Sequence, residues 1–169
     1  KLTNEPVHQN YALTKLLQYQ GATVELSKLI KWSDMLLALN PNASQIRRTN
    51  LYFKLLDPTL RFPSQELMKL TEKARKLDKE LTSMETQITL ALAHLKNNSP
   101  ADALVALGKV SDWRKWAKVR TAWRIVAAQV FKQNGDTEKF LLLSKDIKAK
   151  ELNFAERKSL QSLFNLKFS

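Results

Sequence analysis

Apolar residues recur along almost the whole chain with helical spacing, three and four positions apart. Strict alternation of apolar and polar residues, which is typical of strands, is hard to find over more than a few positions. The clearest rhythm runs through Leu67, Leu70, Ala74, Leu77, Leu81, Met84 and Ile88. The pattern predicts an all-α protein built from amphipathic helices.

Start and stop signals divide this pattern into about nine helices. Candidate N-terminal signals stand at Pro6, Thr23, Ser44, Ser64, Thr82, Ser99, Ser111 or Asp112, Asp136 and Asn153. Candidate stop signals stand at Gly21, Asn40, Asp57, Asn97, Gly108 and Asn134. The rhythm across Leu81 leaves one long helix over 64–96 open, but Thr82 with Glu85 matches a capping box and favours two helices. Asn153 with Glu156 is a second capping-box pattern.

The predicted helix starts pair into units of about thirty to forty residues, which is the length of a helical-hairpin repeat. The units span about 5–42, 44–80, 82–110 and 112–150, and a final helix follows at 153–166. Short turns make consecutive helices antiparallel neighbours. Because no single pair buries its own apolar face, the pairs must stack, and we expect one domain over 1–169.

Several segments resemble the tetratricopeptide repeat (TPR). Residues 29–42 are similar to the second helix of such a repeat, with the closing Asn-Pro, and 134–150 resemble the Gly-Asp turn and the helix that follows it. The segment 86–110 resembles a whole repeat, with Ala91 and Ala103 as the small residues that let paired helices approach.

The sequence also departs from the TPR pattern. Phe140 stands where the family usually has a small residue, His94 takes the aromatic position, and Trp is absent from its usual place. In the segment 64–80, which is similar to another second helix, the loop 58–63 replaces the usual tight turn. The resemblance implies a right-handed superhelix of four degenerate helix pairs plus a C-terminal helix. It also implies a protein-interaction scaffold without enzymatic activity, whose ligands lie in a groove lined by first helices.

The segment 111–132, "SDWRKWAKVRTAWRIVAAQVFK", holds three of the four tryptophans. Taken as one helix, it has a continuous apolar stripe of Trp116, Val119, Trp123, Val126, Ala127 and Val130, which we interpret as core. The opposite face carries Arg114, Lys118 and Lys132, with Lys115 at one edge and Ile125 and Gln129 among them. A third strip contains Trp113, Arg120, Arg124 and Phe131, where the arginines could pack over aromatic rings.

These two cationic strips supply the candidate partner-binding residues: Arg114, Lys115, Lys118, Arg120, Arg124, Gln129 and Lys132. A basic groove wall fits an acidic peptide or a terminal carboxylate. The alternatives are that the first strip is a solvated helix face and that the second marks the edge of helix packing.

The net charge of +12 and the pI near 10.0 favour anionic partners. The chain has no Cys, two widely separated histidines and only three glycines. It therefore offers no thiolate metal site, no clustered catalytic groups and no phosphate-binding loop, so we expect no enzyme, metal or cofactor. No apolar run approaches the roughly 18 residues of a membrane span. Because the chain opens at Lys1, we expect a mature form or a fragment.

Two functions remain in competition. The first is a scaffold that binds a protein segment, an acidic one by charge, in a basic helical-repeat groove. The second is a helical-repeat protein that binds nucleic acid with its basic surface. The absence of a nucleic-acid motif and the assignment of the tryptophans to the core favour the scaffold.

Overall fold

The computed structural model describes residues 11, 14–15, 23–108, 112–145 and 147–167. Within these residues the chain forms helices and no strand, which confirms the all-α prediction. The α-helices are α2 (Leu26–Leu39), α3 (Ser44–Leu56), α4 (Gln65–Glu80), α5 (Met84–Lys96), α6 (Pro100–Gly108), α7 (Thr121–Gln133), α8 (Thr137–Ser144) and α9 (Phe154–Phe164), and the 3-10 helices are η1 (Trp113–Lys118) and η2 (Ala149–Glu151). The start signal at Pro6 and the stop at Gly21, which bound the first predicted helix, lie outside the described residues.

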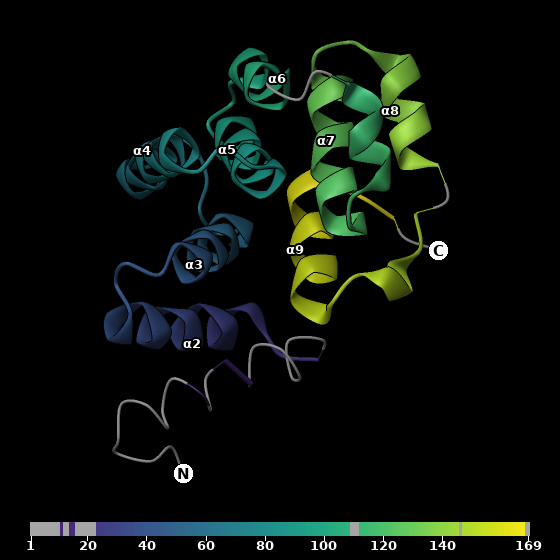
Figure 1. Ribbon diagram of the computed structural model, residues 1–169. Coiled ribbons are helices and arrows are strands. Elements are labelled where there is room, and N and C mark those ends of the chain that lie inside the picture. The colour runs from purple at the N-terminus through teal and green to yellow at the C-terminus, as the bar shows by residue number, and fades with distance from the viewer. Residues whose placement is uncertain (1–10, 12–13, 16–22, 109–111, 146, 168–169) are drawn as a thin grey trace.

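The helices form packed neighbouring pairs in two rows (Figure 1). One row contains α3, α5, α7 and α9, because α3 contacts α5, α5 contacts α7, and α7 contacts α9. The second row lies against the first: α4 contacts α3 and α5, α6 contacts α5 and α7, and α8 contacts α7. Stacking therefore buries the apolar stripes that no single pair could cover.

The core is centred on α5. Every residue from Thr86 to Leu95 is buried, since α3, α4, α6 and α7 all pack against this helix. The amphipathic helix α4, in contrast, buries one face and leaves its lysines exposed. A helix that is buried around its whole circumference occupies an interior position, and α5 is such a helix although it includes buried polar residues.

The region between α4 and α5 confirms two helices, but not the predicted cap. Ser83, one residue after Thr82, caps α5: its Oγ accepts from the backbone N–H of Thr86 at 3.2 Å, and the Thr86 hydroxyl accepts from the backbone N–H of Ser83 at 3.0 Å. The Thr82 hydroxyl instead donates to the carbonyl of Asp78 at 2.9 Å. The Thr86 hydroxyl also donates to the buried Asp78 carboxylate at 2.9 Å. The predicted capping box of Asn153 and Glu156 is confirmed at the start of α9.

The prediction of one helix over 112–132 is wrong. The chain forms the 3-10 helix η1, becomes extended at Val119 and Arg120, and then begins α7 at Thr121. The predicted core position of Trp116 is confirmed, since its side chain is fully buried. Trp123 is only half-buried. The residues before and after the break therefore do not share one helical face.

The last helix of the first row, α9, also contacts the first helix of that row, α3. Figure 1 shows α9, in yellow, between α7 and α3, and it contacts both helices. At this junction the Tyr52 hydroxyl on α3 donates to Glu156 Oε1 on α9 at 3.2 Å. The face that α3 and α7 would otherwise present to solvent is thus partly covered by the chain itself.

Candidate binding groove

A groove of about 360 Å³ lies between α2, α3 and α4. Its lining combines apolar side chains with four cations: Leu37, Pro41, Leu51, Leu70 and Leu77, the polar Asn50, and Arg47, Lys54, Lys73 and Lys76. The helical repeat explains the arrangement. Arg47, Leu51 and Lys54 are four and three positions apart on α3, so their side chains share a face. The residues that α4 contributes have the same type of spacing.

The groove carries an excess of positive charge. Arg47 pairs with Glu80 at 3.0 Å, and Lys54 pairs with Asp34 at 2.7 Å. In the part of the chain that the structure describes, Lys73 and Lys76 are exposed and form no ion pair. Anionic groups entering the groove would therefore find donors that the protein does not already neutralise.

Hydrogen bonds between α2 and α3 hold the polar part of the groove in place. The side-chain amide of Asn50 donates to Ser33 Oγ at 3.0 Å and to Asp34 Oδ1 at 2.8 Å, and these bonds tie α3 to α2. The same Asp34 carboxylate forms the ion pair with Lys54. Because Ser33 and Asn50 are buried, the α2–α3 wall is a packed interface and keeps its shape without a ligand.

The sequence-predicted residues do not form one wall. Arg114, Lys115 and Lys118 are exposed on η1, and Lys132 is exposed near the end of α7. Gln129, which was expected among them, is buried. It lines a separate cavity of about 200 Å³ together with Ile125 and residues of α8 and the C-terminal segment: Phe140, Ser144, Ile147, Leu166 and Lys167.

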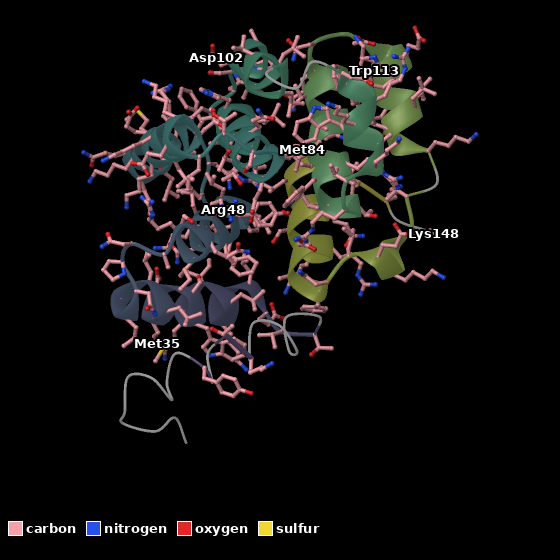
Figure 2. All side chains as sticks on the ribbon, in the orientation of Figure 1. Met35, Arg48, Met84, Asp102, Trp113 and Lys148 are labelled. Atoms are coloured by element: carbon pink, nitrogen blue, oxygen red, sulfur yellow. The ribbon has the colours of Figure 1, made fainter. Side chains whose placement is uncertain are left out.

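The predicted aromatic and arginine strip is divided between two clusters. Trp113 meets Phe131 edge-on, with ring centroids 6.2 Å apart, and Figure 2 shows Trp113 on the α7–α8 side of the molecule. The cation over both rings is Lys139, at 5.8 Å and 5.2 Å, and neither arginine of the strip occupies this position. Arg120 turns toward α3 and α9, and Arg124 is half-buried.

His94 and Lys96, in the last turn of α5, have shifted pKa values. Burial lowers the pKa of His94, and the nearby Asp102 carboxylate, 3.9 Å from Nδ1, only partly opposes this shift. Burial also lowers the pKa of Lys96 to about 8, against the attraction of Asp57. The Lys96 ammonium donates to the carbonyl of Leu55 at 3.0 Å and to the carbonyl of Asp57. It therefore serves as a cationic partner for the C-terminal end of α3.

Other kinds of site receive no support from the described residues. No group of three His, Asp or Glu side chains among them could hold a metal ion. None of the helices in the described ranges has the length and apolar content needed to cross a membrane. A larger pocket of about 400 Å³ also combines apolar side chains with two cations, Arg61 and Lys96, whereas the groove between α2, α3 and α4 brings four cations to an apolar lining.

Sequence reasoning missed this groove although its residues lie in predicted helices. The cations of α3 and α4 have the spacing of a solvated helix face, and only the crossing of three helices makes them converge. Compared with family models, curated proteins and solved structures, the chain matches none of them.

Proposed function

We propose that this chain is a non-enzymatic protein-interaction module that binds an acidic amphipathic helix of a partner protein in the groove between α2, α3 and α4. The observation that carries the proposal is the apolar floor flanked by four cations, two of which form no ion pair among the described residues. An amphipathic helix places apolar residues in such a groove and directs acidic residues to its rim. The two-row packing supports the further proposal that the array is TPR-like.

The expected affinity is modest. Each leucine that a partner buries in the groove contributes about 1.5–3 kcal/mol, and each pair at the charged rim about 0.2–1 kcal/mol. Association and side-chain ordering oppose these contributions by several kcal/mol, so a dissociation constant between about millimolar and micromolar follows. The rim cations act mainly on the association rate and on the choice of an acidic partner over a basic one.

A labelled synthetic helical peptide tests the proposal by fluorescence polarisation. The peptide carries leucines at i, i+3 and i+7 with glutamates on both sides, and a scrambled peptide of the same composition is the control. We expect Lys73→Glu with Lys76→Glu to weaken binding of the patterned peptide about tenfold, because two attractive pairs become repulsive. Both residues are exposed on α4, so the fold should be retained.

Arg114→Glu with Lys118→Glu is the matched variant, since it changes the net charge equally at the exposed residues of η1. We expect it to change the affinity less than the α4 pair does. If the η1 variant weakens binding and the α4 variant does not, the binding site lies at the tryptophan segment and the groove proposal is wrong. Equal affinity for the patterned and scrambled peptides would also contradict it.

A further inference from the structure

Arg120 is held in position by two aromatic rings. Its guanidinium carbon lies 5.9 Å from the ring centroid of Tyr52 on α3 and 5.5 Å from that of Trp123 on α7. Its side chain is 46% exposed. Each such cation–π contact is weak at an exposed site, and both rings belong to elements other than α9. We call Arg120, Tyr52 and Trp123 the anion receptor of the α3–α7 face.

The ligand of this receptor in the structure is Glu156, in the first turn of α9. The Glu156 side chain is 2% exposed, and its Oε1 accepts both from the Arg120 guanidinium and from the Tyr52 hydroxyl. Its Oε2 accepts from the backbone N–H of Asn153 at 3.4 Å, within the capping box. A single carboxylate thus caps its own helix and docks that helix on the receptor.

The remaining anchorage of α9 is limited. Its buried residues are Ala155, Glu156, Ser159 and Leu160, so Leu160 is the one large apolar side chain among them. Leu163 and Phe164 pack only partly buried against the core, and the Lys158–Glu25 ion pair is exposed. Helices with few buried apolar contacts open locally at a lower free energy than the whole domain. The central helix α5, with ten consecutive buried residues, is the opposite case.

We propose that Arg120, Tyr52 and Trp123 form a second binding site, which α9 fills from within and which accepts the first-turn glutamate of a partner helix when α9 detaches. The partner helix would begin with an Asn or Ser capping box whose third residue is Glu, as α9 does. This site goes beyond the proposed function and is separate from the groove between α2, α3 and α4.

The first test asks whether α9 detaches on its own. Hydrogen exchange is measured on the full chain and on Leu160→Ala, which loosens α9 without touching the receptor. We expect exchange over 154–164 to accelerate at least tenfold in the variant while exchange over 86–95 in α5 changes by less than twofold. Equal acceleration in both segments would show that α9 opens only with the whole domain, and would overturn the proposal.

The second test adds a labelled synthetic peptide of residues 149–167 to the Leu160→Ala protein. The tethered α9 competes with any added helix, so the variant should bind the peptide at least tenfold more tightly than the wild-type chain does. A peptide carrying Glu156→Gln is the matched control, and we expect it to bind at least tenfold more weakly. Equal binding of the two peptides would refute the role of the carboxylate.

A third arm separates the two sites. Arg120→Gln in the Leu160→Ala background should reduce binding of the 149–167 peptide, whereas Lys73→Glu with Lys76→Glu should not. If only the α4 substitutions reduce binding, the peptide occupies the groove and the second site does not exist. Because each site has its own variants, failure of one proposal leaves the other testable.

Discussion

Replacing Trp116 with alanine tests the packing of η1 against the rest of the molecule. The side chain is fully buried and belongs to the same core cluster as α5 and α7. A buried tryptophan removes about 150–250 Å² from water, which at about 25 cal/mol per Å² corresponds to about 4–6 kcal/mol. Its indole N–H has no acceptor among the described residues, so removing this donor returns about 1–3 kcal/mol. We expect Trp116→Ala to lower the free energy of unfolding by about 1–5 kcal/mol, and large-to-small substitutions of core aromatic residues typically cost about 3–5 kcal/mol, the upper part of this range.

Two further variants make this prediction specific. Trp116→Phe retains most of the apolar ring and removes the unpaired N–H, so its cost should be only about 1–2 kcal/mol. Trp123 is half-buried, so Trp123→Ala should cost roughly half as much as Trp116→Ala.

Urea denaturation followed by far-ultraviolet circular dichroism measures all three values. A domain of this size has an unfolding free energy of about 5–15 kcal/mol, so the alanine variant at position 116 stays within the measurable range or is visibly unfolded. A loss below about 1 kcal/mol for Trp116→Ala would refute the core assignment. Equal losses for the alanine and phenylalanine variants would refute the claim that burial of the apolar ring dominates the stabilisation.

Three other predictions concern pH and charge. Because burial lowers the pKa of His94, the unfolded chain binds a proton at this residue before the folded chain does as the pH falls below about 6.5. The unfolding free energy should therefore fall in acid, and it should fall less in His94→Gln. Urea titrations at several pH values measure both. Lys96 has a pKa of about 8 in the folded chain, below its usual 10.5, so between pH 8 and 10.5 the unfolded state binds more protons than the folded state. As the pH rises through this range, the unfolding free energy of the wild-type chain should therefore increase relative to that of Lys96→Met. A constant difference in the same titrations would contradict this. Mixed-sequence single- and double-stranded nucleic acids should show no sub-micromolar binding near physiological salt, and tight binding that weakens steeply with salt in a polarisation assay would restore the nucleic-acid alternative.

Local chemistry made several helix boundaries predictable. Ser64 and Asp136 were expected to begin helices, and each side chain accepts a hydrogen bond from the backbone three residues later. Asn153 and Glu156 form the reciprocal capping box that their spacing indicates. Such contacts span only three residues, so the amino-acid types and their spacing contain the information. The choice between Thr82 and Ser83 could not be made in this way, because both can cap a helix and the buried Asp78 decides between them.

The break before α7 depends on distant residues and so could not be predicted. Arg120 is the N-cap of α7, yet its side chain makes no capping hydrogen bond. Its guanidinium instead pairs with Glu156, 36 positions later in the sequence. Helical periodicity runs across Val119 without a stop signal. Treating 111–132 as one helix therefore placed Gln129 on the same face as Arg114, opposite the apolar stripe. Tertiary contacts separate these two residues, and one residue of the expected wall is buried as a result.

The junction of α9 with α3 changes how the chain should unfold. In an open helical array each unit contacts only its neighbours, so stability is a sum of local terms and one end can fray while the other stays folded. Here Tyr52 and Glu156 join segments 104 positions apart, and α3, α5, α7 and α9 form a closed circuit of contacts. Detachment of α9 therefore uncovers α3 and α7 together, and α3 is reached without unfolding the intervening pairs.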